Sequence, residues 1–420
     1  MPDQLQKESF QITLLNEGRF ELIGRDRPDL LLLISIAVLL VIGLSTVFSA
    51  SKAVSESGFF NRQVLWVVIG IAFFLAGTWF SFRRLEEISP FLYLLSCLLL
   101  FVTLFLGGGP ADRWLIIGPL HIQPSEIAKA GLILMSSWWL SSLRVRPRRF
   151  GEILVFLTIL PVIILTLLQP DLGTSVSMIM IVLAIFVWAG YGPGWIYLII
   201  SPVLAAVSSI HIVFWILFMC ILGLILYRRK YPFSSWLIFM GGNSIVAALT
   251  PMAWNLLETY QRSRLITFLD PSSDPHGAGW NIIQSEVAVG SGGLFGQGFL
   301  QGAQKELAYL PARHTDFVFS VWAEETGFLG GFILLAAFFV LIWRITLAAR
   351  KSVNAFNSLV TAGVAAYFTI HVFVNVGMTL GIMPVTGLPL PLISYGGSQM
   401  IVVLFLLGLA VNAGMFWREV

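Results

Sequence analysis

The sequence predicts an all-α polytopic membrane protein, and three observations carry that prediction. Of its 420 residues, 57% are hydrophobic and only 11% are charged, whereas roughly one quarter of the residues in soluble domains are charged. Apolar runs of about 20 residues recur along the chain, and each can cross the hydrocarbon core of a bilayer as a helix. Arginine and lysine gather in short clusters between these runs, as they do in cytoplasmic loops.

We expect about twelve transmembrane helices from the lengths of these runs. The span at 317–348 is longer than the bilayer is thick, so we expect its first turns to protrude. The predicted spans are residues 29–50, 61–82, 88–106, 125–143, 150–168, 172–189, 195–210, 212–227, 234–256, 317–348, 359–380 and 398–416.

The arginine and lysine clusters predict the orientation of the chain, because cytoplasmic loops carry the excess of these residues. Every cluster falls on the same side of an alternating path through the membrane. We therefore expect both termini, including a polar tail at residues 1–27, in the cytoplasm. The clusters are Arg25 and Arg27; Arg83 and Arg84; Arg144, Arg146, Arg148 and Arg149; Arg228, Arg229 and Lys230; Arg344, Arg350 and Lys351; and Arg418.

Residues 257–316 form a long polar connection immediately before the tenth span. Long loops in compact proteins are usually functional or disordered, and residues such as Trp280 and Phe299 argue against disorder, which needs low hydrophobicity. With both termini inside, this segment lies outside the membrane. We predict a folded extracytoplasmic cap that carries the chemistry, within one transmembrane domain at residues 28–420.

Composition and motifs argue against a nucleic-acid, disulfide, metal or nucleotide site. The net charge of +3 gives no sign of nucleic-acid binding. Cys97 and Cys220 lie inside apolar runs and provide no disulfide or metal framework. The glycines between Gly290 and Gly302 follow no predicted strand and precede no GK[ST] sequence, so they do not form a nucleotide loop. We expect tight turns or close helix contacts there.

Ionisable residues near the outer ends of the spans are candidate functional residues, because charge in a membrane segment is costly. Glu126 and Lys129 are three residues apart at a helix start and share a face. A structural ion pair, with Ser125 as the helix cap, is the alternative. Asp171 either serves the site or caps the next helix through the amides near Thr174.

Arg113 stands beside Trp114 in a glycine-flanked loop on the outer side. Its planar guanidinium is suited to bind a phosphate or pyrophosphate with two hydrogen bonds. An exposed loop cation at the level of the lipid headgroups is the alternative.

Asp316 lies where the cap meets the membrane, close in sequence to His314 and to further charged side chains. A carboxylate partly removed from water near other charges is a candidate general base. Favourable electrostatics at a helix start is the alternative, and Thr315 is an equally good capping residue.

Residues 384–397 contain three prolines and three glycines. Such a segment cannot be a regular helix. Non-helical backbone at membrane depth is tolerated only where it is buried in protein or lines a cavity. We therefore expect a broken or re-entrant element beside a polar pocket.

Five motifs in chain order resemble those of the SEDS family, the shape, elongation, division and sporulation proteins. The resemblance covers nearly the whole chain from the first helix, and it is closer to the elongation branch, RodA, than to the division branch, FtsW. The motifs are RWLIIG with QPSEIAK, QPDLGTS, YQRSRLITFLDPSSDPHGAGWNIIQS, LPARHTDFVFSVWAEETG and GIMPVTGLPLPLISYGGS.

The resemblance implies an inverting peptidoglycan glycosyltransferase that polymerises lipid II into glycan strands for cell-wall elongation and rod shape. It implies a location in the bacterial cytoplasmic (inner) membrane, a class B penicillin-binding protein as transpeptidase partner, and contact with other elongation-complex membrane proteins. It implies no certain cofactor. Whether a divalent cation, Mg²⁺ or Mn²⁺, takes part is left open. The sequence shows no metal-ligand spacing, so such an ion would be held mainly by the substrate pyrophosphate.

The resemblance also assigns roles to particular residues. Asp316, the aspartate of the HTDF motif, corresponds to the essential catalytic residue of the family. The residues implied to bind substrate are Arg113, Trp114, Glu126, Lys129, Asp171, Asp270 and Ser394.

The chain departs from the family pattern in two places. Ala312 stands where the family often has an acidic residue. Residues 211–256 form an additional helix pair, so twelve helices replace the usual ten. Because a pair is added, the cap stays outside and the catalytic assignment is unaffected.

Two other functions compete with the enzyme. A flippase or transporter for lipid II would also need many helices, intramembrane charges and a broken helix, although no inverted repeat is apparent and transport does not need a large outer cap. A non-catalytic scaffold for a partner synthase would leave the charges of Glu126, Lys129 and Asp171 without purpose.

Overall fold

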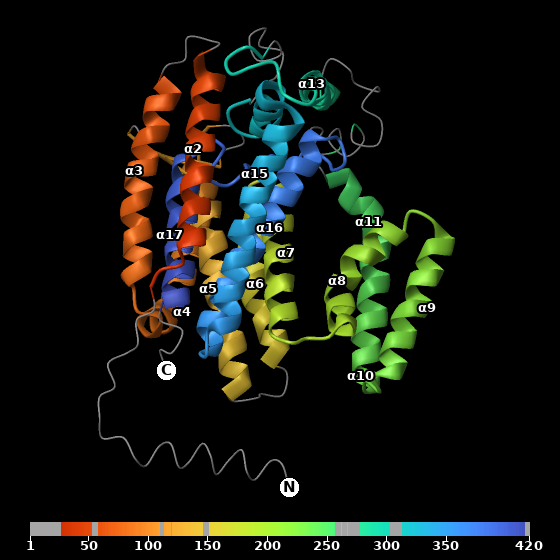
Figure 1. Cartoon of the computed structure of the whole chain (residues 1–420). Helices are drawn as coiled ribbons and strands as arrows, with labels where there is room; N and C mark the ends of the chain where they lie inside the picture. The colour runs from red at the N-terminus through yellow and green to blue at the C-terminus, as the bar shows by residue number, and fades with distance from the viewer. Residues whose placement is uncertain are drawn as a thin grey trace, which may run out of the picture.

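The computed structural model describes residues 27–52, 58–109, 113–118, 120–145, 151–256, 262, 267, 278–302 and 313–415 (Figure 1). The predicted tail at 1–27 falls outside these residues except for Arg27. So do Ala312 and much of the predicted cap, including Asp270.

All twelve predicted spans coincide with helices, and the all-α multi-pass fold is confirmed. Seven helices in the described part are long and apolar enough to cross a membrane. The first ones are α2 (Leu30–Lys52), α3 (Gly58–Trp79), α4 (Phe82–Leu106), α5 (Pro124–Val145), α6 (Gly151–Leu168) and α7 (Leu172–Trp188). They are followed by α8 (Pro193–Ser208), α9 (Ile212–Arg228), α10 (Phe233–Trp236), the π-helical turn η2 (Leu237–Gly241) and α11 (Gly242–Leu256). The last are α13 (Ala278–Ser291), α15 (Val318–Lys351), α16 (Ala355–Thr379) and α17 (Gly397–Met415).

A small β-hairpin that the sequence did not predict precedes α5. Strands β1 (Leu115–Ile117) and β2 (Leu120–Ile122) pair antiparallel, with Ile116 opposite His121. A hairpin of this size is too short to show a clear alternation of apolar and polar residues. Its residues Ile116 and His121 line a cavity that His314 and Thr315 also line.

Close helix packing at glycines holds α3 against α17. A Cβ at Gly77 would lie 2.6 Å from the Phe405 carbonyl oxygen, and one at Gly408 would overlap the Phe74 carbonyl oxygen. Small residues let helix backbones approach closely in membranes, where dispersion contacts replace the hydrophobic effect. Asn412 of α17 adds a hydrogen bond of 2.9 Å to the carbonyl of Phe80, just after α3 ends.

The glycine-rich loop after α13 fills a break in α15. The break is at Gly327, whose φ of 67° and ψ of −164° are not helical. The amide of Gln297 donates to the Glu324 carbonyl at 3.0 Å, and the amide of Phe328 donates to the Gly293 carbonyl at 2.8 Å. The loop therefore pairs backbone groups that the break leaves without helical partners, and the predicted close contacts at these glycines are confirmed.

Helices α8, α9 and α11 form a group beside the main bundle (Figure 1). They share a small core of their own, to which Leu198, Phe218 and Leu222 belong. The principal contact of this group with the main bundle is between α7 and α8. The predicted pair at 211–256 thus packs with α8, and its status as an addition to the family pattern stays a prediction.

The turns that carry arginine clusters lie at the end of the molecule opposite α13. Figure 1 places the start of α4, the α9–α10 turn and the end of α15 at that end. Arg344 near the end of α15 forms an ion pair with Asp29, which precedes α2. This arrangement fits the alternating path that the charge pattern predicts.

The α3–α17 packing predicts that alanine is costly at Gly408 but not at an open glycine elsewhere. Gly408→Ala should lower the free energy of unfolding by about 1–3 kcal/mol, because the new methyl group overlaps backbone that has no room to move. Gly241→Ala, with nothing within 4 Å of the added Cβ, should leave stability unchanged or raise it. Thermal unfolding of both variants in detergent measures the difference, and equal midpoints would contradict this packing.

Candidate functional site

Three hydrogen bonds fix the backbone of the HTD segment at the start of α15. The amide of Tyr395 donates to the His314 carbonyl at 2.8 Å. The Ser394 hydroxyl donates to the Thr315 carbonyl at 2.6 Å, and Nδ2 of Asn375 donates to the Asp316 carbonyl at 2.9 Å. With three successive carbonyls held, the backbone that carries the Asp316 side chain is fixed in place.

The segment between α16 and α17 provides two of these donors and is non-helical, as predicted. Leu392 lies in the left-handed region with a φ of 66°, while its side chain is buried in the core. The Ser394 hydroxyl also accepts from the Leu390 amide at 2.8 Å. Nε2 of Gln63 in α3 donates to the Ser394 carbonyl at 3.2 Å. Side chains of the bundle thus pair the irregular backbone, which is the condition for its presence at membrane depth.

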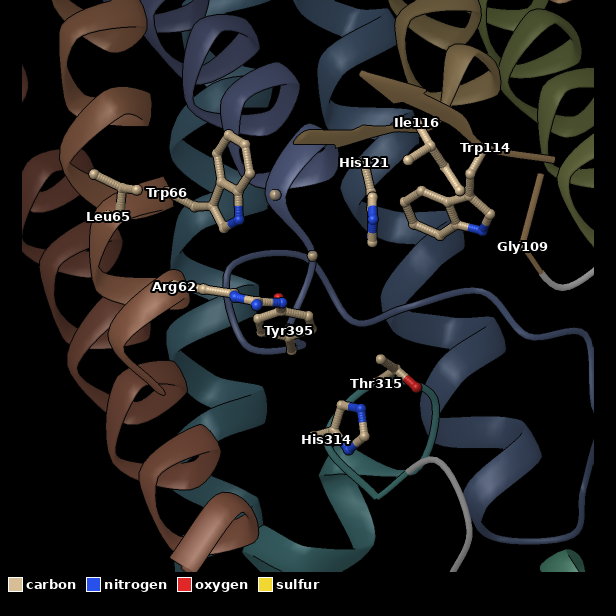
Figure 2. Close-up of a pocket in the computed structure, with 12 residues that line it drawn as sticks. Arg62, Leu65, Trp66, Gly109, Trp114, Ile116, His121, His314, Thr315 and Tyr395 are labelled. Atoms are coloured by element: carbon tan, nitrogen blue, oxygen red, sulfur yellow. The ribbon is translucent and has the colours of Figure 1, made fainter. Parts of the chain in front are cut away.

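A cavity of about 360 Å³, here called the aromatic pocket, lies on one side of the HTD segment. Figure 2 shows Arg62 reaching into it from α3, with Trp114 and His121 pointing in from the hairpin region and His314 and Thr315 on the opposite wall. Other lining residues include Trp66 and Tyr395. The pocket therefore combines indole and phenol rings with two imidazoles and one guanidinium.

A second cavity of about 270 Å³, here called the apolar groove, runs along α7 and is lined by residues such as Val176, Val374 and Leu388. Arg113 and Asp171 also line it. Asn375, next to Val374, bonds both the Asp316 carbonyl and the Leu388 carbonyl, the latter at 2.8 Å. The HTD segment thus adjoins both cavities, because His314 and Thr315 line the first and Asn375 links the Asp316 carbonyl to Leu388 of the second. The half-buried Asp316 itself lines neither of them.

Arg113 is bound by protein groups around the start of α7. Its Nε donates to the Gln169 carbonyl at 2.9 Å, Nη2 donates to the Pro170 carbonyl, and Nη1 lies 3.6 Å from Oδ1 of Asp171. Its side chain is only 19% exposed, so the alternative of an exposed headgroup-level cation is wrong. The guanidinium joins the hairpin loop to the α6–α7 connection, with its charge balanced by Asp171.

Asp171 caps α7, as the capping hypothesis predicted. Its carboxylate accepts from the Thr174 amide at 3.2 Å and from the Thr174 hydroxyl at 2.8 Å. These bonds satisfy one of the free amides at the helix start. Both partners of the Arg113–Asp171 pair therefore have structural tasks, and their contact with substrate stays a prediction.

Glu126 and Lys129 form the ion pair that their spacing predicted, with Nζ 2.8 Å from Oε1. Lys129 is 0% and Glu126 1% exposed, and neither lines the aromatic pocket or the apolar groove. Nζ of Lys129 also lies 3.0 Å from Nε2 of His371, and the Tyr367 hydroxyl donates to Glu126 at 3.2 Å. The pair joins α5 to α16, which is a structural role; substrate contact by either residue stays a prediction.

Ser125 does not cap α5. The helix begins at Pro124, and the buried Ser125 hydroxyl has no hydrogen-bond partner among the described residues. The Ser125 part of the ion-pair alternative is therefore wrong, whereas the ion pair itself is present.

Sequence reasoning missed several residues of this region. Asn375 and His371 lie in the apolar span of α16, and a polar side chain in such a span is itself a signal. Arg62 had a clearer signal, because it is a cation at the start of a predicted span, at the end away from the arginine clusters. Trp66 and Tyr395 gave no signal that distinguishes them from packing residues.

Comparisons with known proteins agree with the motifs. A sequence model of the FtsW, RodA and SpoVE family, described as cell cycle protein, matches residues 29–221 and 214–419. The peptidoglycan glycosyltransferase MrdB of Escherichia coli (strain K12) is 34% identical over 388 residues, which cover 91% of this chain and 92% of the relative.

Solved structures share the fold. A chain of a peptidoglycan synthase complex, described as coordinating polymerization and crosslinking, superposes with a TM-score of 0.66 at 31% identity, covering 92% of this chain and 97% of that one. The crystal structure of the rod shape determining protein RodA of Thermus thermophilus gives a TM-score of 0.60 at 28% identity, with 92% and 96% covered.

The hydrogen bonds of Ser394 predict a large effect for its removal. Ser394→Ala leaves the Leu390 amide and the Thr315 carbonyl without this partner and should cost about 1–3 kcal/mol of stability. Ser136→Ala is the matched control, because its buried hydroxyl has no partner in the described part of the chain. Thermal unfolding, with amide hydrogen exchange of residues 390–395, compares the two; a control as damaging as the test variant would refute this assignment.

The buried ion pair predicts a rescue experiment. Lys129→Met leaves the Glu126 carboxylate buried without its counter-charge and should destabilise the protein by about 3–5 kcal/mol. Adding Glu126→Gln removes the unpaired charge and should recover much of that loss. Unfolding midpoints of the single and double variants test the coupling, and additive losses would contradict it.

Proposed function

Because the chain belongs to the FtsW, RodA and SpoVE family of cell cycle proteins, we propose that it is a peptidoglycan glycosyltransferase that polymerises lipid II for cell-wall elongation and rod shape. The observation that carries the proposal is the fixed HTD segment, which carries Asp316 and adjoins two cavities, in a chain that is similar in sequence to MrdB over 91% of its length.

In the proposed reaction, a hydroxyl of the acceptor sugar attacks the anomeric carbon of the donor sugar. A new glycosidic C–O bond forms, the C–O bond to pyrophosphate breaks, and the hydroxyl proton passes to the carboxylate of Asp316. A general base of this kind contributes about 100- to 10,000-fold to the rate. Because the base activates a hydroxyl and forms no sugar ester, the configuration at the anomeric carbon inverts.

The geometry supports a positioned base in two ways. Its backbone is held at three successive carbonyls, and preorganisation of this kind keeps a catalytic group within reach of its target. A carboxylate near the anomeric carbon also stabilises the oxocarbenium character of the transition state.

Positive charge is needed where the pyrophosphate departs. Arg113 and Lys129 were the sequence candidates, and both are already engaged with carboxylates. The described residues contain no group of three or more potential metal ligands. A Mg²⁺ or Mn²⁺ ion, if the reaction uses one, would therefore be held mainly by substrate phosphates.

The proposal includes a class B penicillin-binding protein as partner, which would cross-link the new strands, and contacts with other elongation-complex proteins. The likeness to a chain of a synthase complex described as coordinating polymerization and crosslinking supports a partner of this kind. The chain is a multi-pass membrane protein. We propose that it lies in the bacterial inner membrane with both termini cytoplasmic, and the arginine clusters opposite α13 support that orientation.

The flippase alternative is not favoured, because the similar curated protein MrdB is named a glycosyltransferase. Purified protein in vesicles separates the functions: glycan polymer supports the enzyme, leaflet exchange of lipid II without polymer supports the flippase, and neither activity supports the scaffold.

Replacing the base predicts a specific loss. Asp316→Asn keeps the shape of the side chain and the backbone bonds but removes the basic oxygen, so polymerisation of lipid II should fall about 100- to 10,000-fold. Product length on gels gives the rate. Membrane insertion and binding of the penicillin-binding protein should not change.

Glu286→Gln is the matched control, because it removes an exposed acid on α13 outside both cavities. It should polymerise lipid II at the rate of the unaltered protein. Near-normal polymer formation by the Asp316 variant would end the assignment of the base.

A further inference from the structure

We infer that the aromatic pocket receives the pyrophosphate-linked donor sugar, and that Arg62 binds the leaving pyrophosphate. This inference rests on the proposed function and assigns a substrate-binding residue that the sequence motifs did not single out. Charge, lining chemistry and position relative to Asp316 carry it.

The charge argument compares the cations around the site. Arg113 has three protein acceptors around it, including Asp171. Lys129 is completely buried against Glu126 and His371. A cation whose charge and donors are already matched gains little from a further anion, because it must give up existing partners to bind it.

Arg62 differs from both. It is exposed in the first turns of α3, and no hydrogen bond or ion pair of its side chain is found among the described residues. Figure 2 shows its guanidinium reaching into the aromatic pocket. A planar guanidinium with open donors suits the paired oxygens of a pyrophosphate, which accept bidentate hydrogen bonds.

The lining of the pocket suits a sugar beside that anion. Trp66, Trp114 and Tyr395 provide ring surfaces, on which the C–H faces of a pyranose pack well. His121 provides polar atoms for hydroxyl groups. Few polar groups on a mostly apolar lining are typical of pockets that orient a small ligand.

The wall formed by α17 depends on a glycine. Gly397 lies against the indole of Trp66, and a Cβ there would overlap the ring. The close contact fixes one face of the ring against α17 at the edge of the pocket. Leu65 and Ile116 also line the pocket and are 54% and 50% exposed. Exposed apolar side chains at the pocket suit the polyprenyl tail of the ligand, which has to pass into lipid.

The position of the pocket beside the HTD segment supports the assignment of its sugar as the donor. His314 and Thr315 line the pocket, and Asp316 follows directly. A sugar at this wall of the pocket therefore lies beside the segment that carries the proposed base, and the acceptor hydroxyl would approach from the Asp316 side. The negative charge that develops on the departing pyrophosphate is then met by Arg62, an interaction that strengthens in the transition state.

The test uses the full chain in nanodiscs and measures binding of polyprenyl pyrophosphate, with uncharged polyprenol as the comparison lipid. Arg62→Gln should weaken binding of the pyrophosphate about 10- to 100-fold, the range for hydrogen bonds to charged groups. Binding of polyprenol should not change. Arg62→Lys keeps the charge without the planar guanidinium, so its affinity for the pyrophosphate should lie between those of the unaltered protein and Arg62→Gln.

Lys52→Gln is the matched control, because Lys52 is an exposed cation in the last turn of α2 that does not line the pocket. It should bind both lipids as the unaltered protein does. The kcat for lipid II polymerisation should fall with Arg62→Gln, because the lost interaction is strongest in the transition state.

The outcomes separate this inference from the proposed function. The assignment of Arg62 is overturned if Arg62→Gln binds pyrophosphate as the unaltered protein does, or if binding weakens but kcat does not change. In either case, polymerisation by the unaltered protein still supports the proposed enzyme. If the unaltered protein forms no polymer but binds pyrophosphate in a way that depends on Arg62, the binding site is supported and the proposed function is overturned.

Discussion

The structure depends on the hydrogen bonds by which two irregular segments pair each other's backbone at one end of the bundle. The HTD segment offers three backbone carbonyls, and the segment before α17, with Asn375 of α16, offers three donors. Buried backbone groups without partners are expensive, above all near lipid. Neither segment can pair these groups as regular helix, so the hydrogen bonds between the two segments stabilise both. The same bonds fix the backbone at Asp316.

Ion pairing distinguishes the ionisable residues with a structural role from those that are available to a ligand. Glu126 with Lys129 and Arg113 with Asp171 are pairs of opposite charge with little exposure. Each pair joins segments that are distant or irregular, and each would leave a costly isolated charge if one partner were lost. Arg62 belongs to no such pair in the described residues. Its open donors, rather than its place in any motif, distinguish it from the other cations of the site.

The sequence predicted the helices well because lipid offers the backbone no hydrogen-bond partners, so long apolar runs have one solution. It predicted the non-helical segment at 384–397 from its prolines and glycines, and the Glu126–Lys129 pair from spacing along one helix. It could not predict that His371 and Tyr367 complete that pair, since α16 is more than two hundred residues away and tertiary packing alone brings them together. Three other features have the same cause, because each depends on neighbours that no local pattern specifies. They are the short hairpin, the binding of Arg113 by the α6–α7 connection and the packing of residues 211–256 against α8.

A structure of the protein with an unreactive lipid-linked donor and an acceptor sugar tests the central claim most directly. The distance that matters joins the Asp316 carboxylate to the attacking hydroxyl of the acceptor. Our account predicts about 3 Å, or one bridging water, with the donor pyrophosphate in the aromatic pocket. Sugars bound on the far side of α7, with the Asp316 carboxylate beyond the reach of one water, would contradict it.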